Sequence, residues 1–212
     1  MIEKQDLLDF WKEKFHFRKA ELEAFRTIRR EDFIPDKTRD FAYQDTPLPL
    51  IRGKTISQPT TVMIMTSALE LRKGDKVFEV GTGSGFQTAI IAKIISPGKV
   101  ISTEVLPELV QFAKENLRRA RIENAFVFEE DGSQGMQNEA PFDKIIITAA
   151  CKEFPKRLVE QLKVGGMIVA PVGSQNEQEM VKGIKTRDGK LELYFLGPFV
   201  FSSMYGKYGF EV

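Results

Sequence analysis

The sequence predicts an α/β fold: a doubly wound, mostly parallel sheet flanked by helices, with a C-terminal antiparallel hairpin and an N-terminal extension of helices and loops. From residue 77 onward, short apolar runs alternate with amphipathic segments, which is typical of parallel strands joined by helices. A turn with glycine at 81, 83 and 85 joins the first run to the first helix. Two alternating runs flank Thr-Arg-Asp-Gly at 186–189, which predicts a hairpin.

The N-terminal third predicts helices followed by a long loop. Residues 5–30 carry apolar side chains at mostly helical spacing, and Phe-His-Phe-Arg at 15–18 can divide them into two helices. Four prolines fall within residues 31–59, so we expect little regular structure there. Loops this long are often functional. A further helix is expected at about 60–71.

The remaining elements follow in regular alternation, and Lys-Val-Gly-Gly at 163–166 predicts the stop of the last helix. We expect one domain with three parts: residues 1–72 (helices and loop), 73–175 (ligand-binding core) and 176–212 (hairpin and tail). The strands are expected at 77–80, 99–104, 125–129, 143–149, 167–172, 179–187 and 190–197, and the core helices at about 84–95, 107–120 and 154–163.

The composition excludes several classes of protein. Lysine and arginine total 31 and aspartate and glutamate 30, so the net charge gives no argument for nucleic acid or a lipid surface. The only cysteine, Cys151, excludes an intramolecular disulfide and fits a reducing compartment. With His16 as the only histidine, a zinc site or a Ser-His-Asp triad has little support.

The N-terminus and the hydropathy pattern indicate a cytoplasmic protein. Met-Ile-Glu-Lys-Gln-Asp is acidic and polar, unlike a secretory signal. No apolar run approaches the ~20 residues that cross a bilayer. We expect a monomer that binds no metal, no nucleic acid and no membrane.

The segment Val-Phe-Glu-Val-Gly-Thr-Gly-Ser-Gly-Phe-Gln-Thr-Ala at 77–89 predicts a ligand site at the end of a strand. A dinucleotide fingerprint would place its third glycine at position 86, which is Phe86. The carboxylate of Glu79 suits a cationic ligand better than a pyrophosphate. S-adenosylmethionine carries a sulfonium and an ammonium and no phosphate, so we expect it here. A strand-to-helix turn needs glycine whatever it binds. The expected contacts are Glu79, Gly81, Thr82, Gly83, Ser84 and Gly85.

Three later strand ends extend this prediction. Glu104 ends the second strand of the core, where a carboxylate can accept hydrogen bonds from both ribose hydroxyls. Asp131 follows the third strand and can accept from the adenine amino group, while Gly132 lets the base approach; Asp-Gly is also an ordinary turn. Thr148 ends the fourth strand beside two alanines. Small residues there either leave space for a substrate or are ordinary packing.

The loop Gly-Lys-Thr-Ile-Ser-Gln-Pro at 53–59 is the second distinctive segment. Pro59 can begin a helix, which places Ser57 near free backbone N–H groups that suit an anionic substrate. The alternative is that Ser57 or Thr55 simply caps that helix. Expected substrate contacts are Thr55, Ile56, Ser57 and Gln58.

Together these segments resemble the protein-L-isoaspartate O-methyltransferase family, whose members have the Rossmann-like class I methyltransferase fold. The resemblance runs in the family's order over residues 29–173. Its pieces are R-R-E-D-F-I-P at 29–35, A-Y-Q-D-T-P-L-P-L at 42–50, G-K-T-I-S-Q-P at 53–59, the glycine segment at 77–89, D-G-S-Q-G at 131–135, A-P-F-D-K-I-I-I-T-A-A at 140–150 and Q-L-K-V-G-G-M-I-V-A-P-V-G at 161–173.

The resemblance implies a function and a role for individual residues. It implies methyl transfer from S-adenosylmethionine to the free α-carboxylate of L-isoaspartyl residues in damaged proteins and peptides, leaving S-adenosylhomocysteine and initiating repair to aspartyl. It makes Ser57 the catalytic residue. It assigns cofactor contacts to Glu79, Gly81, Gly83, Glu104, Asp131 and Gly132.

The sequence departs from the family pattern at four places. Leu50-Ile51-Arg52 stands where a small, glycine-containing step is usual, Phe86 replaces a tyrosine, and Glu130 replaces a glycine. The tail at 199–210 follows the family's ending only loosely. The first and last of these would frame the peptide site.

Three other functions stay open on the sequence alone. One is a methyltransferase of the same fold acting on a small molecule or RNA, which the Ile51-Arg52 departure favours. Another is a binding module without activity, which the intact Thr-Ile-Ser-Gln-Pro loop disfavours. The third is a nicotinamide oxidoreductase, which Phe86 disfavours.

Overall fold

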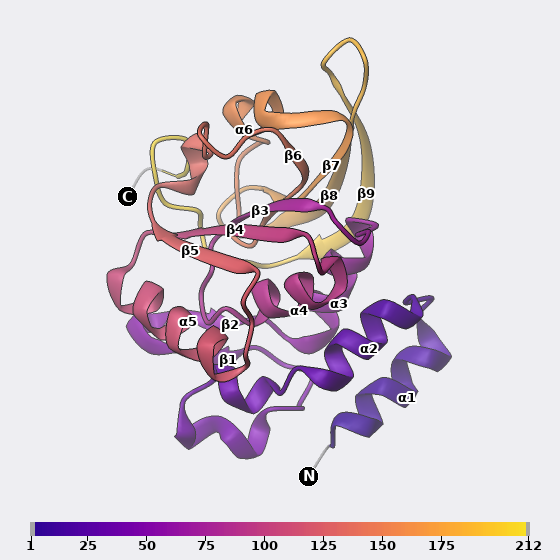
Figure 1. The fold of residues 1–212 in the computed structure, drawn as a ribbon, viewed down its shortest axis with the longest axis vertical. Coiled ribbons are helices and arrows are strands. Elements are labelled where there is room, and N and C mark those ends of the chain that lie inside the picture. Colours follow the sequence, from indigo (N-terminus) through magenta and orange to yellow (C-terminus); the bar gives the residue numbers. More distant parts are fainter. Residues whose placement is uncertain (1–2, 211–212) are drawn as a thin grey trace.

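A seven-stranded sheet forms the centre of the computed structural model, which describes residues 3–210 (Figure 1). The strand order is β5-β4-β3-β6-β7-β8-β9. Neighbouring strands from β5 to β7 pair in parallel, whereas β8 pairs antiparallel with both β7 and β9. The bounds are β3 (Lys76–Val80), β4 (Lys99–Glu104), β5 (Ala125–Glu129), β6 (Phe142–Ile147), β7 (Leu162–Gly173), β8 (Gln178–Lys185) and β9 (Leu191–Phe199).

The order of the strands reverses next to β3. The chain passes from β3 outward through β4 to β5, and then returns to β6 on the other side of β3. In an open α/β sheet, such a reversal leaves a crevice at the carboxyl ends of the strands, where ligands bind.

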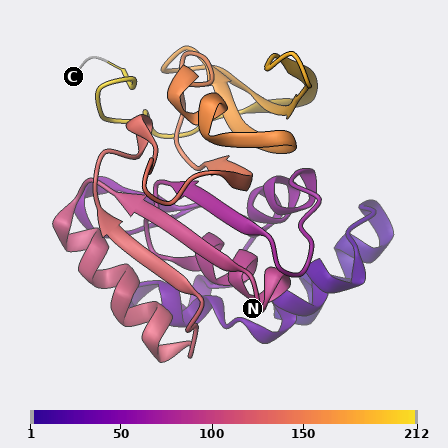
Figure 2. The same cartoon turned by 45° about the horizontal axis from the view of Figure 1, so that its top comes forward.

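Helices cover the two faces of the sheet unequally (Figures 1 and 2). The core on one face includes residues of α1 to α5, and the core on the other face includes α6, which contacts the short helix η4 (Gly132–Gln134). Each face buries its own apolar core: Val77 and Val100 belong to the first, and Phe78 and Ile101 to the second. These alternate residues follow the two-residue period of a strand. The helices are α1 (Lys4–Lys14), α2 (Lys19–Thr27), α3 (Pro59–Ala68), α4 (Phe86–Ile95), α5 (Pro107–Arg119) and α6 (Lys156–Gln161).

The predicted loop at 31–59 contains only short elements. Three 3-10 helices lie in it, and β1 pairs antiparallel with β2 to make a small ribbon. This ribbon presents Ser57 at the start of α3. The elements are η1 (Arg30–Phe33), η2 (Asp36–Phe41), η3 (Ile51–Gly53), β1 (Leu48–Pro49) and β2 (Thr55–Ile56).

The fold prediction is confirmed, and one local prediction is wrong. Helix α6 ends at Gln161, and residues 163–166 belong to β7 rather than to a helix stop. The register of β6 and β7 shifts there. A Cβ on Gly166 would lie 2.9 Å from the Asp143 carbonyl, so Gly166 allows a close approach of the two strands, whereas Gly165 has a left-handed backbone with φ 77° and no close neighbour. Across residues 3–210, no helix has the length and apolarity needed to cross a membrane.

Candidate active site

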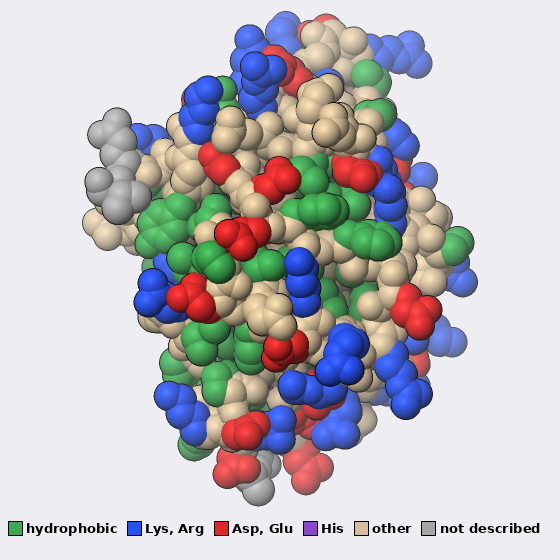
Figure 3. All heavy atoms as spheres, turned by 60° about the vertical axis from the view of Figure 1, so that its left-hand side comes forward, with side chains coloured by type: hydrophobic (Ala, Val, Ile, Leu, Met, Phe, Trp, Pro, Cys, Tyr) green, Lys and Arg blue, Asp and Glu red, His purple; other side chains and the backbone are tan. Residues whose placement is uncertain are grey.

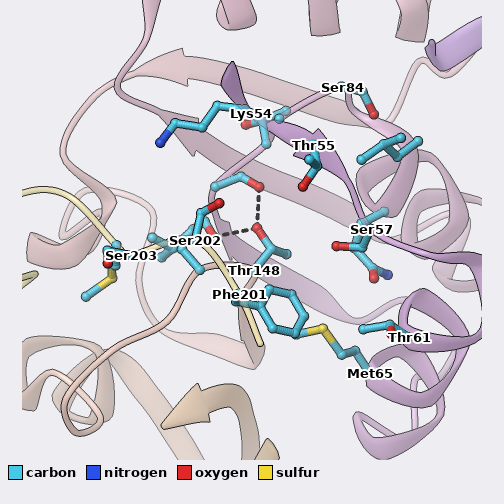
Figure 4. A pocket seen from close by; sticks show the side chains of 18 of the residues that line it. Lys54, Thr55, Ser57, Thr61, Met65, Ser84, Thr148, Phe201, Ser202 and Ser203 are labelled. Carbon is cyan, nitrogen blue, oxygen red and sulfur yellow. Dashed lines mark hydrogen bonds between the residues drawn. The ribbon is translucent and has the colours of Figure 1, made fainter. Parts of the chain in front are cut away.

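A cavity of about 810 Å³ opens at the carboxyl ends of β3, β4 and β6, within the size range of small-molecule sites (Figure 4). Its lining includes the ribbon and loop at 54–58, helix α3, the glycine turn at 81–84 and the C-terminal residues 198–205, together with residues that follow β4, β5 and β6. Of the predicted site residues, the lining includes Thr55, Ile56, Ser57, Gln58, Gly81, Thr82, Gly83, Ser84, Glu104, Gly132 and Thr148.

The glycine turn brings bare backbone to the cavity. Gly81 has φ 95°, and a Cβ on it would lie 2.5 Å from the Thr148 hydroxyl oxygen. Gly83 has φ 54°, and a Cβ there would meet nothing within 4 Å. The left-handed conformation therefore favours glycine at both positions. Only Gly81 also needs it to make room for a neighbouring side chain.

Glu104 holds the turn and still faces the cavity. Its Oε2 accepts from the Gly83 N–H at 3.0 Å, and its Oε1 accepts from the N–H groups of Val105 at 2.9 Å and Leu106 at 3.1 Å. A carboxylate has about four lone-pair sites. One site is left for a ligand hydroxyl.

Glu79 lies beneath the turn rather than in the lining. Its Oε2 accepts from Ser102 Oγ at 2.6 Å and from the Thr88 hydroxyl, and Ser102 also bonds to Thr82 at 2.6 Å. Its Oε1 is buried without a hydrogen-bond partner in the described part of the chain. Burial raises the pKa of Glu79 to about 7, against the lowering effect of Ser102 and Thr88.

Asp131 is not among the residues that line the cavity, and its expected contact with adenine stays a prediction. Burial raises its pKa, but the hydrogen bonds from the Lys207 N–H, Ser133 and Gln134 outweigh this and lower it. Lys207 N–H donates at 2.8 Å and the Ser133 hydroxyl at 2.6 Å. The carboxylate is therefore committed to the C-terminal tail. Its neighbours Glu130 and Gly132 line the cavity instead.

Gly85 and Thr148 hold the glycine turn in place: Gly85 packs it against α5, and Thr148 bonds it to the end of β6. Gly85 caps α4, and a Cβ on it would lie 3.3 Å from Leu117 of α5, so it serves packing and not the lining. The Thr148 hydroxyl donates to the Gly81 carbonyl at 2.5 Å and the Val80 carbonyl at 3.1 Å. These bonds tie the ends of β3 and β6 together.

Ser57 faces the cavity with its hydroxyl free of partners among residues 3–210 (Figure 4). It does not cap α3, because Asp45 accepts from the Thr60 N–H at 2.8 Å in the first turn. Its carbonyl accepts from Arg30 Nη2 at 3.0 Å. Arg30 is fully buried, and desolvation lowers its pKa to about 10. A buried guanidinium therefore positions the loop that carries Ser57.

Helix α3 forms part of the wall that the sequence did not indicate, and individual residues of the tail, which was expected to frame the peptide site, form another part. Thr61 and Met65 line the cavity from α3, and Phe201, Ser202 and Ser203 line it from the tail (Figure 4). The tail is held by the Ala150 N–H, which donates to the Ser202 carbonyl at 2.8 Å. The aromatic residues within 199–205 are visible in the sequence, but no local pattern predicts which part of the fold they contact.

The residues present fit S-adenosylmethionine. Three carboxylates, Glu104, Glu130 and Glu177, line the cavity, and Glu79 has an unpartnered buried oxygen beneath the turn. Such a set of hydrogen-bond acceptors suits a cationic nucleoside and not a phosphate. In the described residues, no group of three or more His, Cys, Asp or Glu side chains could hold a metal ion.

Comparisons with known proteins agree with this geometry. Residues 2–207 match the family model described as protein-L-isoaspartate(D-aspartate) O-methyltransferase. The protein-L-isoaspartate O-methyltransferase of Methanoculleus marisnigri is 45% identical over 190 residues, covering 90% of this chain and 85% of the relative. That of Pyrococcus horikoshii is 42% identical over 220 residues and covers 100% of both chains.

Solved structures share the fold. A protein-L-isoaspartate O-methyltransferase matches with a TM-score of 0.89 at 26% identity, covering 98% of this chain and 67% of its own. A Plasmodium falciparum structure assigned to the same activity, in complex with S-adenosyl-L-homocysteine, matches with a TM-score of 0.83 at 23% identity, covering 97% and 99%. The cavity, the family model and these relatives lead to one conclusion: this chain belongs to the protein-L-isoaspartate(D-aspartate) O-methyltransferase family.

Proposed function

We propose that this protein transfers a methyl group from S-adenosylmethionine to the free α-carboxylate of L-isoaspartyl residues in damaged proteins and peptides. The observation that carries the proposal is the unpartnered Ser57 hydroxyl, which faces the cavity beside the glycine turn (Figure 4). The family and the named activity of its relatives support it. Methylation of this carboxylate initiates repair to an aspartyl residue.

The residues of the chain perform this reaction mainly by alignment. S-adenosylmethionine, when bound, supplies an electrophilic methyl group on a sulfonium. A carboxylate with a pKa near 4 is already ionised at neutral pH, so the site needs no general base. Ser57 donates a hydrogen bond that orients this carboxylate. The tail and α3 exclude water, which strengthens that contact.

Each part of the cavity has a proposed task toward the cofactor. Glu104 accepts from one ribose hydroxyl with its remaining lone pair. Gly132 and Glu130 flank the base, and the backbone of Gly81–Ser84 lies along the methionyl part. Glu79 acts from beneath as a positioning residue that holds the turn through Ser102 and Thr82. Thr55, Ile56 and Gln58 frame the acceptor next to Ser57.

The proposed partners are isoaspartyl-containing proteins and peptides, and not nucleic acid. On the face shown in Figure 3, Lys and Arg side chains are interspersed with Asp and Glu side chains instead of forming a continuous basic surface. This distribution suits nucleic acid poorly. The single cysteine, which is buried, accords with the reducing cytoplasm that we propose as the location of a monomer.

The departure at Ile51-Arg52 gives the alternative acceptors little support. Neither residue lines the cavity, and the Arg52 side chain faces Glu108 at 3.5 Å. Because neither residue belongs to the lining, the departure at these positions does not alter the cavity wall around Ser57.

A matched pair of peptides tests the function. The two peptides share one sequence and differ only in an L-isoaspartyl or an L-aspartyl residue, and both are incubated with radiolabelled S-adenosylmethionine. We expect label only in the isoaspartyl peptide, as a base-labile ester. Equal labelling of both peptides, or labelling of RNA or a catechol with neither peptide labelled, would overturn the proposal.

A further inference from the structure

Lys54 is the one cationic side chain in the cavity lining formed by the described residues. It stands directly before β2. Its ammonium donates to the Tyr205 hydroxyl at 3.0 Å and lies 4.3 Å from the centroid of the same ring. Tyr205 belongs to the tail. The pair therefore joins the loop wall of the cavity to the tail wall.

The charge of Lys54 is not neutralised by the protein. None of the ion pairs found in residues 3–210 includes it. The Tyr205 hydroxyl is a neutral partner, and an ammonium has three N–H donors, so two donors remain. Arg52 differs, because it faces Glu108 and lies outside the lining. Lys54 can therefore bind an anion on a ligand.

Lys54 is too far from Ser57 to hold the same carboxylate. Three residue steps separate their Cα atoms, up to about 10 Å at 3.3 Å per residue of extended chain, and the two residues flank the short strand β2 (Thr55–Ile56). Figure 4 shows the ammonium pointing away from Ser57. An ammonium on the acceptor carboxylate would also make that oxygen a poorer nucleophile. The cation therefore faces another part of the bound peptide.

We propose that Lys54 and Tyr205 form a subsite for a second carboxylate of the substrate, two or three residues away from the isoaspartyl residue. The distance of about 10 Å corresponds to three residues of extended peptide. This inference rests on the proposed function and adds a substrate preference to it. The tyrosine ring holds the ammonium in place, and the remaining N–H groups bind the carboxylate of an acidic side chain or of a peptide C-terminus.

The test compares isoaspartyl peptides with blocked ends that carry Glu or Gln at the second or third position on either side. At low salt, we expect kcat/KM to be about 2- to 5-fold higher for the Glu peptide at one or more of these positions. About 0.5 M NaCl should remove most of this preference. A further peptide carries a free C-terminal carboxylate at the same position in place of Glu, which separates the two sources of the anion.

Variants assign the preference to the subsite. Lys54→Gln should methylate the Glu and Gln peptides equally, and Lys54→Arg should keep the preference. Arg52→Gln is the matched control, because it removes a cation from the same loop outside the cavity, and it should also keep the preference. Tyr205→Phe retains the ring and should reduce the preference. Circular dichroism verifies that each variant folds.

Two results would overturn the inference. One is equal kcat/KM for Glu and Gln peptides at all four positions with the wild-type protein. The other is a preference that persists in Lys54→Gln. Both differ from a failure of the proposed function, in which no isoaspartyl peptide is methylated at all.

Discussion

At the scale of single residues, Ser57 is a hydroxyl that the fold leaves unused. Asp45 takes over the capping of α3, and Arg30 holds the Ser57 carbonyl from the buried side. Both contacts fix the backbone while the hydroxyl stays free for a ligand. Capping statistics alone favour a serine at this position as a cap. The tertiary contacts of Asp45 and Arg30 show instead that the Ser57 hydroxyl is left free for a ligand.

Ser57→Ala should lower kcat/KM for an isoaspartyl peptide by about 100-fold, because the acceptor loses its alignment. Binding of S-adenosylhomocysteine, measured by calorimetry, should persist, since no proposed cofactor contact is lost. Ser67→Ala on α3, outside the lining, is the control and should keep full activity. Undiminished turnover of Ser57→Ala would remove Ser57 from the mechanism.

Glu79 gives a pH-dependent prediction for the ligand-free protein. Burial raises its folded-state pKa to about 7 from the ordinary value of 4.5, so the folded state binds the proton more tightly than the unfolded state does. The contribution of this proton to stability is complete below about pH 4.5 and is lost as the pH rises through 7. The loss amounts to about 3 kcal/mol.

Glu79→Gln removes this titration. Between pH 5 and pH 8, its free energy of unfolding should rise relative to that of the wild type by up to about 3 kcal/mol. Denaturant unfolding of both proteins at several pH values measures the difference, in which the other titrating groups cancel. Parallel profiles would show that the buried carboxyl titrates as an ordinary one.

At the scale of elements, the tail depends on η4 for its place. Asp131 accepts from the Lys207 N–H at 2.8 Å, and Ser133 Oγ accepts from the Tyr208 N–H at 3.1 Å. A Cβ on Gly206 would lie 2.0 Å from Asp131 Oδ1. Asp131 therefore shapes the cavity indirectly, by docking the tail that forms one wall.

Gly206→Ala should undock the tail and weaken cofactor binding about 10-fold or more, since a wall of the cavity is lost. Gly189→Ala is the matched control. Gly189 also has a left-handed backbone, φ 81° against 115°, but a Cβ there meets nothing within 4 Å. It should cost a comparable strain of about 1 kcal/mol and leave binding intact. Equal cofactor affinity in Gly206→Ala and the wild type would contradict this role of the tail.

Local signals in the sequence predicted the helices and strands but not the place where the tail docks. The bounds of β4 and β5 agree with the predicted 99–104 and 125–129, because each is an apolar run between clear breaks. The glycine turn and Glu104 could be found because they follow strand ends in order. The docking of residues 206–208 depends on Asp131, some 75 positions earlier. Hydrophobic periodicity reports only on neighbouring residues, so it cannot predict such a contact. Lys54 and Tyr205, which are in contact, are 151 positions apart, and this larger separation hid their contact in the same way.

At the scale of the whole molecule, the cavity lies where several parts of the chain meet. The strand reversal beside β3 opens the crevice, and the N-terminal loop and the C-terminal tail close it from two sides. Fold class followed from the alternation of strands and helices. The N-terminal loop and the C-terminal tail complete the site, and the sequence could not place them because their positions depend on tertiary packing.

The central claim is that this cavity takes up the cofactor, and titration calorimetry at neutral pH tests it most directly. We predict that the wild-type protein binds S-adenosylmethionine at one site per chain. Its thermal midpoint should rise with ligand concentration, as mass action requires. The absence of both binding heat and a thermal shift, in protein that circular dichroism shows to be folded, would contradict the account.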